Sequence, residues 1–327
     1  MEIGKTLRNW VKETYELDVI TRQQLFLKYL EILFADNIYD RNLEKIRSFP
    51  NLEFYKLCDY LIDERVLIGF NHNSRGYSYF IKKGTTPTSE MAISALYPLG
   101  FLSHLSAMNL YALSNTKSSG IYFTCPNRSD WKKLCLKNIK KRFKGLSIAM
   151  PVSNKYIEIN GFIFSTQSIL DPYPNQKILE EAGSNKALII INKKSSVESE
   201  WWNNCHIQNI VDLYLDMLKA PHYCGGISHV LKIYQDHLIE DQKLLSDILD
   251  ILDKTGSIID KARVGCILNK VFAIESSQLD KWKFEQIGKR GSSRKLFSNF
   301  EFDSFFDEEW NISINHPTIK NLYQKKI

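Results

Sequence analysis

The sequence predicts an α+β protein, with a winged helix-turn-helix domain at the amino terminus and a larger mixed α/β domain whose carboxyl-terminal half is helical. Three observations predict this class. Apolar residues recur at helical spacing near the start of the chain, a β-hairpin pattern follows them, and helical patterns fill most of the chain beyond residue 205. With 327 residues the chain is long enough for two domains, which we expect at 1–84 and 85–327.

The elements of the first domain follow one another closely. Apolar spacing predicts a helix over residues 3–11, and Thr21 is placed to cap a second helix that extends to Phe34. A shorter helical pattern covers 39–49, and Pro50 begins a further helix. Two β-rich runs, VLIGF and YSYFI, then flank the polar turn NHNSRG, which predicts a hairpin.

Helices followed by a hairpin within about 80 residues match the winged helix-turn-helix plan, in which the pre-hairpin helix lies in the major groove and the hairpin contacts the DNA backbone. Another small α+β domain would give the same pattern. Charge supports DNA binding poorly, because residues 1–84 hold 13 Lys/Arg against 12 Asp/Glu. The expected DNA contacts are basic residues on the helices before the hairpin and on the hairpin itself: Arg41, Lys45, Arg47, Lys56, Arg75, Lys82 and Lys83.

The second domain begins after the linker KKGTTPTSE, where Thr88 or Ser89 can cap a helix. Asn160–Gly161 between alternating apolar residues predicts a tight hairpin. The other expected elements are helices over 90–99, 103–113 and 130–143, a strand over 120–126, a buried strand KALIIIN, helices over 207–218, 226–239, 241–254 and 257–272, and a final strand WNISIN.

The predicted helix 130–143 is markedly basic. From Arg128 to Lys144 there are eight basic residues and one acid, Asp130. This pattern predicts either a surface for phosphate or an acidic partner, or a solvated lysine face without a ligand. The candidates for an antitoxin or extended nucleic-acid surface are the lysines of this ridge and the basic residues of the loop GKRGSSRK: Lys133, Lys137, Lys140, Lys141, Lys144, Lys289, Arg290 and Arg294.

The composition of the chain is typical of a globular protein that does not span a membrane. Hydrophobic residues make up 44% of the chain, and the longest apolar run, ALIII, is far too short to span a bilayer. The charged beginning of the chain is unlike a secretory signal, and six scattered cysteines without a CxxC pair are typical of reduced thiols. We therefore expect a cytoplasmic protein with no membrane partner.

The stretch KAPHYCGGISHVLKIYQDHL, residues 219–238, raises the question of a metal site. His229 and His237 would lie about 12 Å apart along one helix, whereas two ligands of one zinc ion must lie within about 4 Å of each other. Pro221 and Gly225–Gly226 instead predict a turn between two helices. Because no hydrolase, P-loop or dinucleotide motif is present either, we expect no metal, no cofactor and no enzyme activity.

Several motifs, in this order, resemble one known family. They include FLSHLSAMNLYAL, the strand GIYFTCPN, and an apolar helix with Asp212 that leads to Pro221 and Gly225–Gly226. A later helix, KARVGCIL, carries Arg263, Gly265 and Leu268. In this arrangement the chain resembles the AbiEi family, the antitoxin and repressor half of AbiE-type (type IV) abortive-infection toxin–antitoxin operons.

The resemblance implies a transcriptional autorepressor and antitoxin in phage defence. Its partners would be double-stranded DNA of its own promoter, with inverted repeats, and a nucleotidyltransferase-like toxin that it neutralises without a stable complex. Helix 51–63 would enter the major groove and Arg75 would lie at the tip of the wing. Two alternatives stay open: a nucleic-acid-modifying enzyme guided by its first domain, and a protein-interaction module that uses the ridge 128–144.

Overall fold

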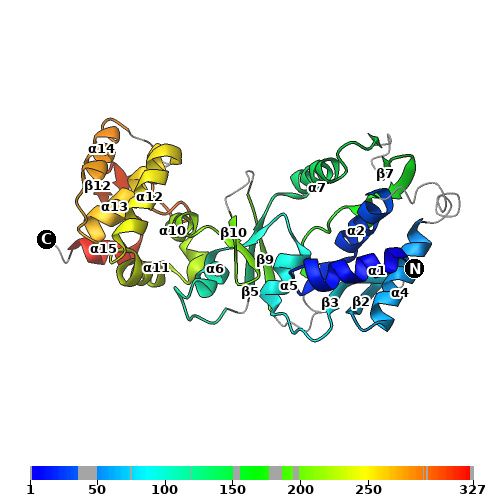
Figure 1. The fold of residues 1–327 in the computed structure, drawn as a ribbon. Coiled ribbons are helices and arrows are strands. Elements are labelled where there is room, and N and C mark those ends of the chain that lie inside the picture. The colour runs from blue at the N-terminus through cyan, green and yellow to red at the C-terminus, as the bar shows by residue number, and fades with distance from the viewer. Residues whose placement is uncertain are drawn as a thin grey trace. The chain divides into compact units, whose positions relative to one another are not determined.

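The computed structural model describes residues 2–35, 50–73, 76–118, 120–149, 155–176, 186–193, 199–289, 291 and 294–324. The fold is mixed α+β, as predicted, and combines helices with several small sheets (Figure 1). The chain divides into two compact units, of which the first is Met1–Leu102 with Ser119–Ile207 and the second is Ser103–Ser118 with Gln208–Ile327. None of the described helices is long and apolar enough to cross a membrane.

The start of the first unit combines helices with a three-stranded antiparallel sheet. In chain order its elements are α1 (Glu2–Asn9), a π-helical turn (Trp10–Thr14), β1 (Val19–Thr21), α2 (Arg22–Ala35), α4 (Pro50–Asp63), β2 (Leu67–Asn73) and β3 (Gly76–Lys82). The strand order is β1–β3–β2, so the last strand lies in the middle.

Local rules predicted these elements well. The Thr21 hydroxyl accepts a hydrogen bond from the Gln24 backbone N–H at 2.9 Å, which caps α2 as expected. The predicted helix from Pro50 and the predicted hairpin are confirmed as α4 and β2–β3. The helix predicted over 39–49 lies outside the described residues.

Among its described residues, the rest of the first unit holds a mixed five-stranded sheet, a smaller antiparallel sheet and three helices. The five-stranded sheet has the order β10–β11–β4–β5–β9 and the smaller one β6–β7–β8. The elements are α5 (Ser89–Leu96), β4 (Phe101–Leu102), β5 (Gly120–Cys125), α7 (Arg128–Arg142), β6 (Ile148–Ala149), β7 (Tyr156–Ile159), β8 (Phe162–Ser165), α8 (Thr166–Ile169), β9 (Ala187–Asn192), β10 (Ser199–Trp202) and β11 (Cys205–Gln208).

Three details of these sheets bear on the predictions. Asn160 and Gly161 both have positive φ, 52° and 82°, and form the tight turn expected between β7 and β8. The KALIIIN strand, β9, is half-exposed and not buried, because it lies at the edge of its sheet beside β5 alone. Residues 205–208 form a strand where a run of helices was expected to begin.

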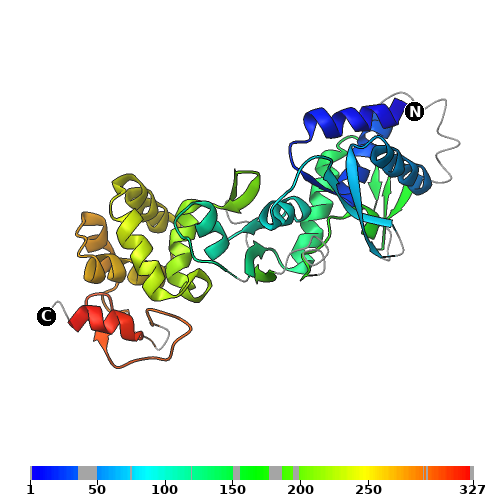
Figure 2. The same ribbon diagram turned by 90° about the horizontal axis from the view of Figure 1, so that it is seen from below.

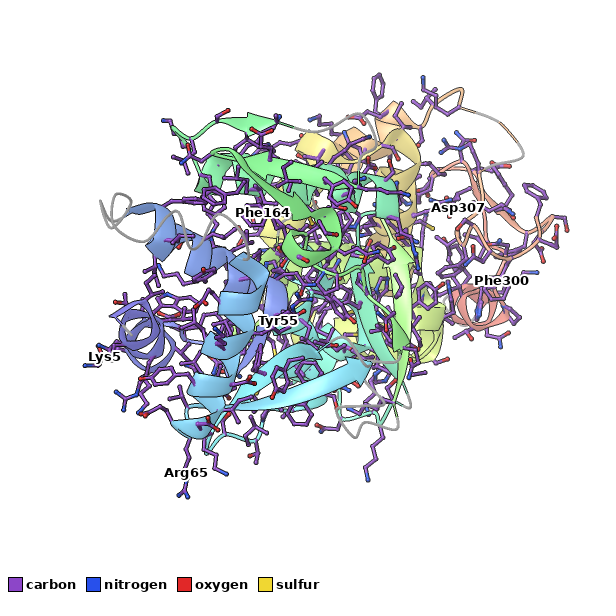
Figure 3. The ribbon with its side chains drawn as sticks, turned by 90° about the vertical axis from the view of Figure 1, so that its right-hand side faces the viewer. Lys5, Tyr55, Arg65, Phe164, Phe300 and Asp307 are labelled. Atoms are coloured by element: carbon purple, nitrogen blue, oxygen red, sulfur yellow. The ribbon has the colours of Figure 1, made fainter. Side chains whose placement is uncertain are left out.

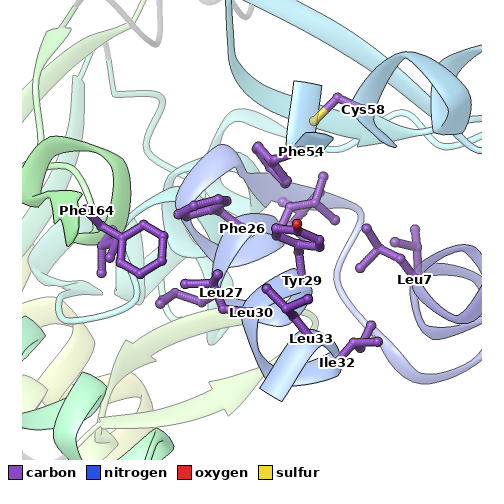
Figure 4. Packing of buried hydrophobic residues seen from close by; sticks show 14 of the residues in the cluster. Leu7, Phe26, Leu27, Tyr29, Leu30, Ile32, Leu33, Phe54, Cys58 and Phe164 are labelled. Atoms are coloured by element: carbon purple, nitrogen blue, oxygen red, sulfur yellow. The ribbon is translucent and has the colours of Figure 1, made fainter. Parts of the chain in front are cut away.

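One hydrophobic core joins the amino-terminal helices to α7 and to the β7–β8 hairpin. The Phe26 ring lies 4.8 Å from the Phe54 ring of α4 and 5.7 Å from the Phe164 ring of β8, between ring centroids. Figure 4 shows Phe26 with Phe164 on one side and Phe54 on the other, and Figure 2 shows the blue helices beside the green hairpin. The predicted boundary after residue 84 therefore passes through a continuous core.

The second unit is largely helical, as predicted for the carboxyl-terminal half. Its elements are α6 (His104–Leu110), α10 (Ile210–Lys219), a 3₁₀ turn (Pro221–Cys224), α11 (Ile227–Ile233) with a π-helical end (Tyr234–Leu238), α12 (Gln242–Thr255), α13 (Ile258–Cys266) with a π-helical end (Ile267–Val271), α14 (Ser277–Glu285), β12 (Phe306–Asp307), β13 (Ile312–Ser313) and α15 (Pro317–Gln324). A steric constraint explains why residue 265, in KARVGCIL, is a glycine. A Cβ atom on Gly265 would lie 2.2 Å from the Trp310 ring, so any other residue would push that buried indole aside.

Candidate nucleic-acid interface

The helix expected to enter the major groove, α4, has an acidic exposed face. The exposed residues from the described part of α4 and the turn after it are Glu53, Lys56, Asp59, Asp63, Glu64 and Arg65. Lys56 forms an ion pair with Glu53 at 3.3 Å, and Arg65 extends from the end of the helix away from the fold (Figure 3). Four carboxylates against two cations oppose the approach of a phosphate backbone.

The basic residues of the predicted wing differ in exposure and in contacts. Lys82 is partly buried and donates a hydrogen bond to the backbone carbonyl of Tyr15, with its ammonium 5.4 Å from the Tyr15 ring centroid. Burial lowers the pKa of Lys82, although Asp18 and Glu16 act in the opposite direction. The Lys82 ammonium is thus held by an internal acceptor, whereas Lys83 is exposed. Outside the described residues lie Arg41, Lys45, Arg47 and Arg75.

The basic helix α7 is formed and held by clear local features. The Asn127 side chain accepts a hydrogen bond from the Asp130 backbone N–H at 3.0 Å and caps the first turn. Basic residues in the last turn complement the helix dipole, and Gly145, with φ 98°, follows the helix end. The core-facing residues recur four apart and are all buried: Trp131, Cys135, Ile139 and Phe143.

The opposite side of α7 and the turn that follows it present five exposed lysines, which we call the lysine face: Lys133, Lys137, Lys140, Lys141 and Lys144. Lys133 pairs with Asp130 at 3.0 Å. The other four form no ion pair with any described residue. At 1.5 Å per residue the four lysines within the helix, from Lys133 to Lys141, extend about 12 Å along its axis. A positive strip of this length, largely without internal counter-charges, is suited to a polyanion.

Arg142, also in α7, does not belong to this face. Its guanidinium forms an ion pair with Glu31 of α2. Burial alone would raise the pKa of Glu31, but hydrogen bonds and charges from Arg142 and Lys28 lower it below its usual range. The pair therefore fixes the end of the basic helix to α2 and leaves the lysines to face outward.

The basic loop near residue 290 belongs to the second unit. Lys289 is exposed, and Arg290 lies outside the described residues. The expectation that Arg294 lies on a surface is wrong, because its side chain is only 7% exposed. Its guanidinium donates to the Gln286 side-chain oxygen at 2.7 Å and to the Trp310 carbonyl at 3.0 Å. These internal acceptors hold the arginine inside the fold.

The histidine-rich stretch forms the turn between helices that the sequence predicted. Gly225 and Gly226 both have positive φ, 84° and 90°, directly before α11, and Cys224 is fully buried. The His229 ring lies 2.9 Å from the Ser114 hydroxyl, between Nε2 and Oγ. The part of the chain that the structure describes holds no group of three or more His, Cys, Asp or Glu residues that could bind a metal ion.

Sequence reasoning missed one further feature beside the lysine face. Arg128, Trp131 and Tyr173 come together with Gln23 at the start of α7, around a hollow of about 390 Å³. No local pattern indicates this grouping, because its members come from three separate stretches of chain.

No family model and no curated protein matches the sequence. Among solved structures, the fold is similar to that in the crystal structure of the RV2827C protein from Mycobacterium tuberculosis, with a TM-score of 0.46 and 10% sequence identity. The match covers 100% of this chain and 95% of that one. A likeness at this level carries no argument about function.

Proposed function

We propose that the protein is a cytoplasmic, DNA-binding autorepressor and antitoxin, which acts on its own promoter and neutralises a nucleotidyltransferase-like toxin in phage defence. The observation that carries the DNA-binding part is the lysine face of α7, with four of its five ammonium groups unpaired among the described residues. The antitoxin part rests on the resemblance of the sequence motifs to the AbiEi family.

The connectivity of the first unit supports the winged-helix part of the proposal. A helix, a short strand, further helices and a hairpin follow in order, and the short strand pairs with the second strand of the hairpin. This order is typical of winged helices. An independent winged-helix domain has its own core, whereas these helices share theirs with α7.

The charges favour α7, and not α4, as the main contact with duplex phosphates. A duplex presents about seven phosphate charges over the roughly 12 Å that the helical part of the lysine face covers. Contact with four or five of them gives a slope of about −4 in a plot of log affinity against log salt concentration. Inverted repeats in the operator would bring two chains together and double this contribution.

A fluorescence-anisotropy titration of a labelled duplex from the protein's own promoter tests the proposal. The triple variant Lys137→Ala, Lys140→Ala, Lys141→Ala should bind at least about tenfold more weakly and lose about three units of salt slope. The matched control is Lys232→Ala, Lys243→Ala, Lys254→Ala, which removes the same charge from exposed positions of the second unit. Equal losses in the two variants would contradict a specific role for α7.

The same unpaired lysines favour one second candidate, a module that binds an acidic protein through the lysine face. In that case duplex DNA would fail to bind at physiological salt, while an acidic protein would co-purify and be lost in the α7 triple variant but not in the control. The neighbouring reading frame separates the candidates cheaply, because only the antitoxin proposal requires it to encode a nucleotidyltransferase-like protein.

A further inference from the structure

A second cavity, of about 210 Å³, lies between α2, the second half of α7 and the segment that follows α8. Aliphatic side chains form part of its wall, among them Leu27, Ile139 and Ile169. Two charged residues of opposite sign, Arg142 and Asp171, also line it. The cavity is smaller than a drug-sized site of about 300–1,000 Å³, so it admits a ligand of only a few heavy atoms.

The Asp171 carboxyl group is held against α7 without a hydrogen-bond donor of its own. The Asp171 backbone carbonyl accepts from the Trp131 ring N–H at 3.0 Å and from the Cys135 thiol at 3.9 Å, which fixes the residue in place. The carboxyl oxygen Oδ1 is buried and accepts no hydrogen bond from any residue that the structure describes. Burial raises the pKa of this carboxyl to about 6, although Arg142 acts to lower it. At neutral pH the group is therefore mainly a carboxylate, which is costly to bury unless a donor reaches it.

The Arg142 guanidinium brings the opposite charge to the same cavity. Its Nε donates to Glu31, and no hydrogen bond joins its two Nη groups to a described residue. Two such groups can donate in parallel to a carboxylate. Asn138, one helical turn earlier on α7, lines the cavity with an amide that also forms no hydrogen bond within the described part of the chain.

The charges at and beside the cavity balance one another. Lys28 pairs with Glu31 at 3.0 Å, so Lys28 and Arg142 stand against Glu31 and Asp171. A ligand with a net charge would leave one charge unbalanced in a place that is partly shielded from water. A ligand that carries one positive and one negative group would keep the balance and pair with both Asp171 and Arg142.

We propose that this cavity binds a small aliphatic α-amino acid as its zwitterion. The ammonium group of the ligand donates to the Asp171 carboxylate. The carboxylate of the ligand accepts from the Nη groups of Arg142 and from the Asn138 amide, and its side chain packs against the aliphatic wall. The inference goes beyond the proposed function, and it would stand if the chain bound no DNA.

Isothermal titration of the full chain with L-valine at about pH 7.5 tests the site. Isobutylamine is valine without its carboxylate, and 3-methylbutanoate is valine without its ammonium group. Valine should bind with a dissociation constant of about 1 mM or lower. Each analogue should bind at least about tenfold more weakly, because it leaves one charged group of the cavity unpaired. Glycine should bind at least about fivefold more weakly than valine, because it lacks the apolar side chain.

Asp171→Asn keeps the shape of the side chain and should weaken valine binding at least about tenfold. The variant should melt no lower than the wild-type protein, because it removes a carboxylate that burial disfavours. Its binding of 3-methylbutanoate should not fall, whereas general damage to the cavity would weaken both ligands. The matched control is Asp63→Asn, which removes a carboxylate from an exposed position of α4 and should leave valine binding unchanged.

Three results would overturn the inference: no binding of valine at about 10 mM, an analogue with one charge that binds as tightly as valine, or unchanged valine binding by Asp171→Asn. If the promoter duplex binds and valine does not, only this inference fails. If valine binds and the duplex does not, the amino-acid site stands and the repressor proposal fails.

Discussion

The two helices α4 and α7 lie against one core but present opposite charges to solvent. α4 holds the position before the hairpin that a winged helix gives to its groove-reading helix, yet its exposed face is mainly acidic. α7 has no such place in that plan and carries the lysine face. The difference teaches that the position of a helix in a topology does not determine its chemistry. What a helix can bind depends on the charges of the face that stays exposed after packing.

The largest effect is expected from breaking the core that the two helices share. Phe26→Ala should lower the free energy of unfolding by about 3–5 kcal/mol, the usual cost of removing a buried phenylalanine ring. Because Phe26 touches both Phe54 and Phe164, the loss should affect both regions together. Denaturant titrations followed by far-ultraviolet circular dichroism and by tryptophan fluorescence should shift by the same amount. An unchanged transition in the Phe26→Ala variant would contradict the shared core.

Reversing charge on each helix in turn tests the comparison directly. Lys137→Glu with Lys141→Glu should weaken binding to the promoter duplex about a hundredfold at low salt, because two attractive contacts become repulsive. Asp59→Lys with Asp63→Lys, on α4, should change affinity by less than about threefold if that face lies away from the DNA. Tighter binding of the α4 variant by tenfold or more would restore α4 as the groove helix.

A smaller effect is expected at Asp171, which lies beside α7. Its folded pKa, about 6, is above the ordinary value, so the folded state holds a proton that the unfolded chain has lost between about pH 4 and 6. Stability should therefore fall as pH rises through this range. Asp171→Asn should remove most of that fall and raise the free energy of unfolding at pH 7 by about 1–2 kcal/mol. Thermal melts of both proteins at pH 4.5 and 7 would measure it, and parallel pH profiles would count against a buried carboxylate.

The smallest effects are expected from two surface ion pairs, one within each helix. They are Lys56–Glu53 in α4 and Lys133–Asp130 in α7. Each lysine-to-alanine change should leave the denaturation midpoint almost unchanged, because exposed ion pairs contribute little to stability. In the anisotropy titration, Lys133→Ala should reduce the salt slope by less than one unit, because its charge is partly neutralised, and Lys56→Ala should leave it unchanged. A larger slope change for Lys56→Ala than for Lys133→Ala would reverse the comparison.

The sequence predicted what depends on neighbouring residues. Thr21 at a helix start, Asn160–Gly161 in a hairpin and the periodicity of α7 are local patterns, and each produced the expected element. It did not predict what depends on distant partners. The β9 strand is half-exposed because of the order of the strands, and Arg294 is buried because Trp310, sixteen residues later, supplies an acceptor.

In the candidate site, too, local patterns predicted some features, and others depend on residues that are distant in the sequence. The exposed lysines follow from helical spacing alone, so the lysine face could be predicted residue by residue. The acidic face of α4 also follows from the spacing of Glu53, Asp59 and Asp63, which outnumber Lys56 on the exposed side of the helix. The hollow beside α7 could not be predicted, because Gln23, Arg128 and Tyr173 meet only in the folded chain.

The ion pair between Arg142 and Glu31 has a consequence for how long the protein resists proteolysis. It ties the basic helix to α2, so whatever occupies the lysine face also holds the amino-terminal helices in place. A ligand at a hundred times its dissociation constant adds about 2.7 kcal/mol against opening of the unit it grips. Proteases cleave unfolded segments, so protein that is bound to its target should be degraded more slowly than unbound protein. Turnover would then clear the unoccupied copies first.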